Sequence, residues 1–89
     1  MNQTTITKDC LIPVTISDGM FASEYSIELK LADGTLVSFF ADKNLVVNKN
    51  NEWFLKTAFV DQRGQNTLVL LPVEPFETQS RWAEVKNAA

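Results

Sequence analysis

The sequence predicts a small all-β domain, either an SH3-like barrel or a strongly bent antiparallel meander of six or seven short strands. Apolar and polar residues alternate with period two in several stretches, as in strands with one buried face. Turn residues recur about every 8–12 positions, and no stretch is convincingly helical. A chain of 89 residues supports one modest core, and closure would hide sheet edges that otherwise aggregate. An OB-like barrel and a flatter sheet closed by dimerisation are the alternatives.

The first predicted strand runs from about Ile6 to Ser17. Pro13 cannot donate to a ladder, so we expect it at a sheet edge or a bulge. Asp18-Gly19 then predicts a turn, after which Met20-Phe21 begin the return. The apolar residues of this strand fall on even positions, interrupted by Lys8: Ile6, Cys10, Ile12, Val14 and Ile16.

The strongest local signal is a β-hairpin from Glu24 to Ala41, closed at Asp33-Gly34. Asp-Gly accepts the positive φ angles of tight hairpin turns. The return arm, residues 36–41, is apolar on both faces, so its register decides which residues reach the core. On the first arm, apolar residues alternate with polar ones: Tyr25, Ile27, Leu29 and Leu31 against Glu24, Ser26, Glu28 and Lys30.

Two registers of this hairpin are open. A two-residue Asp33-Gly34 loop places Ile27 opposite Phe40 and turns Phe39 outward. A three-residue Ala32-Asp33-Gly34 loop with a bulge slips the return arm by one residue, so that Phe39 faces inward and Phe40 outward. In both registers one phenylalanine lies on the polar face and needs a cover.

The second half continues as strands and turns. Asparagine tolerates the left-handed region and bonds its own backbone, which favours a turn at residues 48–51. In order, we expect a short strand at Leu45–Val47, the asparagine turn, a strand at Glu52–Val60, a turn at Gln62–Asn66, and an apolar strand at Thr67–Val73 that ends at Pro72 and Pro75.

The tail from Phe76 to Ala89 has two interpretations. Trp82 and Val85 lie three residues apart, as on one face of a helix. Residues 80–86 also form a strand pattern with Ala83 and Val85 inward, which the preceding rhythm of strands and turns favours. We expect one domain, 1–89, with residues 1–4 and 87–89 frayed.

Composition excludes several function classes. The net charge of −3 works against binding to a phosphate backbone. The chain has no histidine and one cysteine, Cys10, so histidine triads, zinc sites built on several His or Cys, and intrachain disulfides are ruled out. No signal-peptide pattern and no run long enough to span a bilayer occur, so we expect a cytoplasmic protein that does not contact membranes.

No set of residues indicates catalysis. The carboxylates are scattered over turns and polar strand faces, where they usually make turn hydrogen bonds. Glu74 and Glu77, which flank Pro75-Phe76, are the least routine pair, but no nucleophile accompanies them. The glycines are isolated, so no phosphate-binding loop is present. We expect no enzyme, no cofactor and no metal.

Weak binding of single-stranded nucleic acid is the alternative function. Small barrels bind single strands through aromatic platforms and basic grooves. Lys43, Lys49 and Lys56 surround Trp53 and Phe54, the best local candidate. The acidic balance of the chain disfavours this function.

Protein interaction is the function that the sequence favours, with either a second copy or another protein as the partner. The chain has six phenylalanines, two tryptophans and one tyrosine, several of them adjacent, and neighbours on a strand face opposite sides. Exposed apolar patches mark association sites. The opposing interpretation fills a small barrel from both faces, with the tail over the second face. The candidate interaction residues are Met20, Phe21, Phe39, Phe40, Trp53, Phe54, Arg81 and Trp82.

Three stretches carry a resemblance: residues 18–24 (DGMFASE), 39–43 (FFADK) and 71–77 (LPVEPFE) running on to Ser80-Arg81-Trp82. Together they resemble small uncharacterised proteins of cyanobacterial type with an SH3-like barrel. The resemblance covers about a third of the chain and assigns no chemical role to any residue. It implies a bacterial cytoplasm and a barrel that acts by binding something else.

Overall fold

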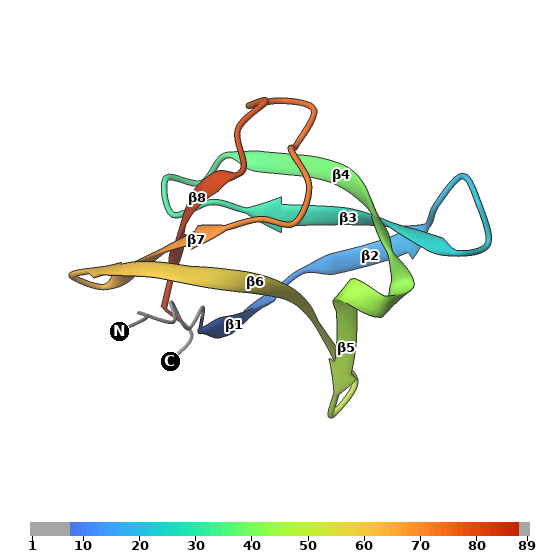
Figure 1. Ribbon diagram of the computed structural model, residues 1–89, viewed down its shortest axis with the longest axis horizontal. Coiled ribbons are helices and arrows are strands. Elements are labelled where there is room, and N and C mark those ends of the chain that lie inside the picture. The colour runs from blue at the N-terminus through green and yellow to red at the C-terminus, as the bar shows by residue number, and fades with distance from the viewer. Residues whose placement is uncertain (1–7, 88–89) are drawn as a thin grey trace, which may run out of the picture.

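The computed structural model describes residues 8–87 and folds them into short antiparallel strands (Figure 1), which confirms the all-β class. One 3-10 turn, η1 (Lys43–Leu45), interrupts the strands. Within residues 8–87, no helix is long and apolar enough to cross a membrane. The strands are β1 (Asp9–Pro13), β2 (Thr15–Asp18), β3 (Glu24–Lys30), β4 (Leu36–Asp42), β5 (Val46–Lys49), β6 (Glu52–Arg63), β7 (Asn66–Leu70) and β8 (Trp82–Lys86).

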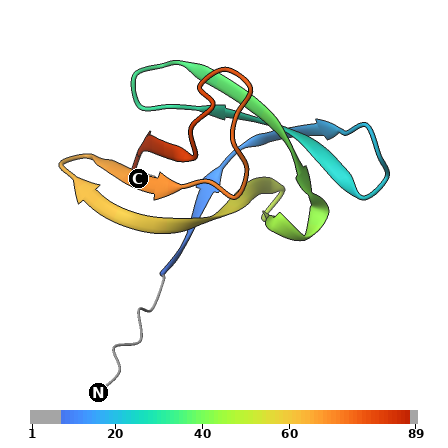
Figure 2. The same ribbon diagram turned by 45° about the horizontal axis from the view of Figure 1, so that its top comes forward.

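The strands form two sheets. In one sheet β2, β3 and β4 lie in that order, and in the other β1, β6, β7 and β8 do, with β5 also paired to β6. Figures 1 and 2 show the hairpin of β3 and β4 on one side of the molecule and the long β6 on the other. The core fills the space between the two sheets.

The predicted strand from Ile6 to Ser17 is divided, which gives eight strands in residues 8–87 instead of six or seven. At Val14 the chain passes from one sheet to the other: β1 pairs with β6, and β2 pairs with β3. The Val14 amide donates to the Trp53 carbonyl at 3.0 Å as the strand leaves β6. Pro13 ends β1, an outer strand, as expected of a residue that cannot donate. Ile6 and Thr7 lie outside the described residues.

The β3–β4 hairpin adopts the register of the three-residue loop. Ile27 pairs with Phe39, and the Leu31 amide donates to the Thr35 carbonyl at 2.8 Å. Gly34 has φ 93°, a left-handed conformation that favours glycine. Phe39 therefore points into the core, where 1% of its surface is exposed, and Phe40 points outward.

The later turns form where the sequence predicts them. Asn50 and Asn51 have φ of 54° and 66° and form a two-residue loop between β5 and β6, as expected of residues that tolerate this region. Gly64 (φ 60°) turns the chain between β6 and β7. A register shift between Phe59 and Asp61 leaves Val60 as an extra residue, and β6 continues to Arg63.

The tail forms a strand, β8, and not a helix. It pairs with β7, and Ala83 and Val85 are buried as predicted. The Asn87 amide donates to the Gln65 carbonyl at 2.9 Å and extends this pairing by one residue. Residues 1–4, 88 and 89, where we expected fraying, lie outside the described residues.

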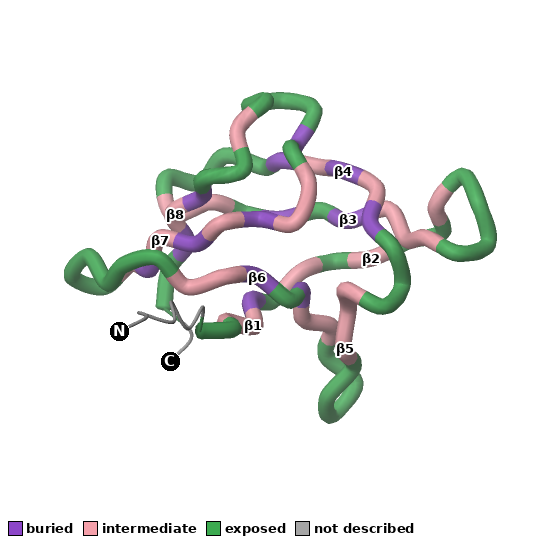
Figure 3. The backbone as a smooth tube through the Cα atoms, viewed as in Figure 1, coloured by how far each residue is buried: buried purple, intermediate pink, exposed green. Residues whose placement is uncertain are grey.

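The sheets do not close into a barrel, so the bent meander is the better of the two predicted descriptions. β8 contacts the β3–β4 turn through one hydrogen bond, from the Ala32 amide to the Glu84 carbonyl at 2.9 Å. No ladder joins β8 to β3 or β4 in the described residues. Figure 3 shows buried positions recurring along the strands. The core residues are Ile12, Ile27, Leu29, Val37, Phe39, Ala41, Leu55, Val69, Leu71, Ala83 and Val85.

Candidate functional site

The segment between β7 and β8 folds back over β4. Residues 72–80, which we call the strap, rise over β4 in Figures 1 and 2. Two hydrogen bonds of 2.7 Å close the base of the strap, one from the Leu71 amide to the Arg81 carbonyl and one from Arg81 Nε to the Leu71 carbonyl. Arg81, predicted as an interaction residue, thus binds the protein's own backbone through its guanidinium.

The tip of the strap binds the edge of β4. The Phe76 amide donates to the Ser38 carbonyl at 3.0 Å. In return, the Ser38 amide donates to Glu77 Oε1 at 2.7 Å and the Ser38 hydroxyl donates to Glu77 Oε2 at 2.8 Å. The Phe76 ring meets the Phe40 ring edge to face, with centroids 5.8 Å apart. The Phe76 ring therefore covers part of the outward Phe40 ring, for which the sequence predicted a cover.

The Glu77 carboxylate is an anionic hydrogen-bond acceptor. The bonds from the Ser38 amide and hydroxyl lower the pKa of Glu77 below its ordinary value of 4.5. Both carboxylate oxygens accept hydrogen bonds from Ser38, so Glu77 holds two chain segments together. Glu74, its predicted partner, is exposed.

The outer face of the β2–β3–β4 sheet carries a row of apolar side chains. We define the outer face by Leu36, Ser38 and Phe40 of β4 and by Phe76 of the strap. Leu36 is 53% exposed and Phe76 62%, and Phe40 is half-buried. Ser26 and Lys30 lie opposite Phe40 and Leu36 on β3 and give the row a polar border. Exposed apolar patches are typical of association surfaces.

The other predicted interaction residues do not gather in one place. Met20 (73% exposed) and Phe21 (68%) lie in the loop between β2 and β3, and Trp82 (58%) begins β8. Figures 1 and 2 show that loop and β8 at opposite ends of the molecule. Phe39 was a candidate under one register only, and its burial places it in the core.

The two aromatic residues of the nucleic-acid candidate, Trp53 and Phe54, lie on β6 beside other strands. Trp53 meets Tyr25 edge to face with ring centroids 5.6 Å apart, and Lys43 Nζ lies 4.7 Å from the centroid of the Tyr25 ring. Phe54 is half-buried opposite Val47 of β5. A base needs an open ring face on which to stack, and the Trp53 ring already contacts Tyr25 within the protein.

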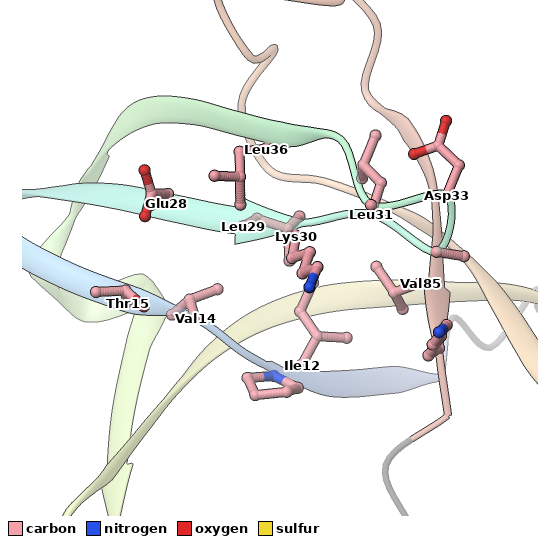
Figure 4. A pocket seen from close by; sticks show the side chains of 14 residues that line it. Ile12, Val14, Thr15, Glu28, Leu29, Lys30, Leu31, Asp33, Leu36 and Val85 are labelled. Atoms are coloured by element: carbon pink, nitrogen blue, oxygen red, sulfur yellow. The ribbon is translucent and has the colours of Figure 1, made fainter.

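A cleft of about 610 Å³ opens where the two sheets diverge. Its floor is apolar core, including Ile12, Leu29 and Val85, and its rim carries Glu28 and Asp33 (Figure 4). Asp33 accepts from the Thr35 amide at 2.9 Å, and this bond lowers its pKa below the ordinary 3.8. The Asp33 carboxylate thus fastens the turn.

Metal-ligating side chains do not cluster in residues 8–87. No group of three or more His, Cys, Asp or Glu side chains lies close enough there to hold a metal ion. Cys10 is half-buried and packs against the core, as expected for a small apolar residue.

The site residues that sequence analysis missed are Leu36, Ser38 and Phe76. Phe76 stood in an irregular corner between Pro75 and Glu77, and its neighbour Glu77 was considered only for acid–base chemistry. An aromatic residue beside an acid after two prolines was the available signal. Ser38, the residue of β4 that Glu77 binds, lies 39 positions from Glu77, and no local sequence pattern marks this contact.

Comparison with known proteins gives no relative: no family model, no curated protein and no solved structure matches this chain. The resemblance to SH3-like proteins of cyanobacterial type stays an expectation. The description of the outer face therefore rests on contacts within this chain alone.

Proposed function

We propose that the protein is a non-catalytic interaction module that binds another protein through the outer face. The observation that carries this proposal is the row of Leu36, Phe40 and Phe76, because two of these large apolar side chains are more than half exposed. Burying such side chains contributes roughly 25 cal/mol per Å² of apolar area removed from water. A second protein surface gains that free energy by covering them.

The fixed position of this row supports a binding role. Leu36 and Phe40 stand on a strand that pairs with β3 over seven residues. A partner therefore orders few side chains on binding, which limits the entropic cost of association. Lys30 and Glu28 on β3 supply the polar rim that such interfaces carry.

The partner is either a second copy or a different protein, and both use the same row. A homodimer would bring two copies of the row together around a twofold axis. An accessory subunit would present it to one other chain. Both forms predict that the same variants abolish binding.

Weak binding of single-stranded nucleic acid is less favoured. Tyr25 and Trp53 contact each other, Lys43 lies over Tyr25, and the chain carries a net charge of −3. Salt-sensitive binding of a labelled oligonucleotide that disappears in a Lys49→Glu/Lys56→Glu variant would support this alternative over protein binding.

The test compares the wild type with a Leu36→Ser/Phe40→Ser variant, because both side chains stand on β4. Val60→Ser is the matched control, because Val60 is also an exposed apolar strand residue, at 38%, but lies on β6. Light scattering after size exclusion measures self-association, and capture from a lysate of the source organism measures a stoichiometric partner. The proposal expects a dimer or a partner that the double variant loses and Val60→Ser keeps. A monomer without a partner, or a partner that the double variant still binds, would contradict it.

A further inference from the structure

β4 is an outer strand, so one of its edges faces away from β3. The Ser38 amide and carbonyl point along that edge, because both bind the strap. Backbone directions alternate along a strand, so the amides and carbonyls of Leu36 and Phe40 point the same way. An extended chain can therefore pair with this edge at three alternate residues, Leu36, Ser38 and Phe40. Among the described residues, the strap binds the backbone of Ser38.

The tip of the strap occupies this edge much as a short strand would. The Phe76 amide donates to β4 as a strand amide does, and the Glu77 carboxylate takes the place of a strand carbonyl opposite the Ser38 amide. The rings of Phe40 and Phe76 meet as a cross-strand aromatic pair does. The strap thus displays the chemistry that the edge accepts: an aromatic residue followed by an acid.

The contacts at the tip are easier to open than the sheets. The bonds between Ser38 and Glu77 are exposed to solvent, and Phe76 is largely exposed. Gln79 adopts φ 54°, an uncommon conformation for a residue with a side chain. Pro75 beside the tip is buried, but solvent-exposed hydrogen bonds such as those between Ser38 and Glu77 mark backbone that opens locally.

From this geometry we infer that the strap is a built-in competitor for the β4 edge, and that the partner of the outer face is an extended peptide segment with an aromatic residue followed by an acidic one. The inference rests on the proposed function and names the chemistry of its partner. The segment adds a strand to β4 after displacing the strap tip. Strand addition gains affinity from main-chain hydrogen bonds, and the side chains select the sequence.

The strap tip belongs to the same chain as β4, so a partner must bind the β4 edge more tightly than this tethered tip does. A short linker holds the strap tip near β4 at an effective concentration on the order of millimolar. A segment that binds Ser38 alone competes poorly with this tip. A longer segment that also pairs with Leu36 and Phe40 makes further backbone bonds and displaces it.

The probe is a synthetic peptide with the sequence of residues 71–80, LPVEPFETQS. The receptor is the full chain with Phe76→Ala and Glu77→Ala, in which the strap tip no longer fills the edge. Amide chemical shifts of Leu36, Ser38 and Phe40 report binding. We expect saturable shifts at these amides in the variant, and none in the wild type at equal peptide concentration.

The control peptide carries the same two alanine substitutions and is expected to bind the variant about tenfold more weakly, since the bonds to Ser38 involve a charged acceptor. A Glu74→Ala chain is the control for a general effect of removing a strap carboxylate, and it should behave as the wild type. Retained shift dispersion in the double variant shows that its fold is intact.

Three results would overturn the inference: a folded double variant with no peptide-dependent shifts, equal binding of both peptides, or concentration-dependent dimerisation of the variant that peptide does not reverse. The last result assigns the edge to a second copy. These outcomes leave the proposed function standing if the wild type still binds its partner through Leu36 and Phe40. The comparison of the outer-face double variant with Val60→Ser tests separately whether that partner binding is lost.

Discussion

The amide of Ser38 donates to a carboxylate oxygen of Glu77 at 2.7 Å, although 39 positions separate the two residues. This bond and its companion from the Ser38 hydroxyl fasten the strap to an edge that β4 would otherwise leave open. Open edges invite pairing with other chains. Ser38 and Glu77 therefore decide both how well the edge is covered and what can replace the cover.

Stability should fall on acidification through Glu77 and Asp33. Both have a folded pKa below the ordinary values of 4.5 and 3.8, because each carboxylate accepts backbone hydrogen bonds. The sign follows from linkage: their contributions are complete above those ordinary values and disappear as the pH falls through the folded pKa. Urea midpoints measured between about pH 6 and pH 2 should decline, and Glu77→Gln with Asp33→Asn should flatten the curve. An unchanged curve in the double variant would contradict this role.

Phe39→Ala and Phe40→Ala should differ strongly in stability. Phe39 is 1% exposed in the core, and losing a buried ring costs about 3–5 kcal/mol. Phe40 is half-buried and contacts Phe76 at one edge, so its loss should cost about 1 kcal/mol. Urea unfolding measures both. A larger cost for Phe40→Ala than for Phe39→Ala would favour the register of the two-residue loop.

Gly34→Ala should destabilise the β3–β4 hairpin by about 1–2 kcal/mol. Gly34 has φ 93°, and an added Cβ meets no atom within 4 Å, so the cost comes from the backbone conformation and not from a clash. Gly34→Asn should cost less, because asparagine tolerates positive φ better. Thermal unfolding of the two variants gives the comparison, and an alanine variant as stable as the wild type would refute it.

Arg81→Ala should loosen the base of the strap. The guanidinium donates to the Leu71 carbonyl at 2.7 Å, and hydrogen bonds from charged groups contribute about 1.5–3 kcal/mol. Arg81→Lys should not rescue the variant, because a lysine ammonium cannot reproduce the planar donor. Hydrogen exchange at the Leu71 amide, which donates to the Arg81 carbonyl, should accelerate in both variants. Exchange at the wild-type rate would show that the side chain adds nothing.

Local chemistry made much of the fold predictable. Asp33-Gly34, Asn50-Asn51 and Gly64 form turns where the sequence expects them, because positive φ selects these residues. The alternation around Ala83 and Val85 placed β8 correctly. The choice between the two hairpin registers was open, since both bury one phenylalanine. It follows from the bulge at Gly34.

Long-range contacts were not predictable. The division at Val14 depends on a bond to Trp53, and alternation continues unbroken through that point. The outer face was half predicted: Phe40 was a candidate, but Phe76 gains its place through the long-range contacts of Phe76 and Glu77 with Ser38. Arg81, a predicted interaction residue, is exposed and also donates to the Leu71 carbonyl, a contact that no periodic pattern reveals.

The most direct measurement is amide hydrogen exchange of the wild type with and without its captured partner, or at concentrations above and below dimer formation. The amides of Leu36 and Phe40 should exchange more slowly in the complex, because the partner covers the outer face beside β4. Those of Met20, Phe21 and Trp82 should keep their rates. Protection confined to Met20 and Phe21, or to Trp82, with Leu36 and Phe40 unchanged, would contradict the account.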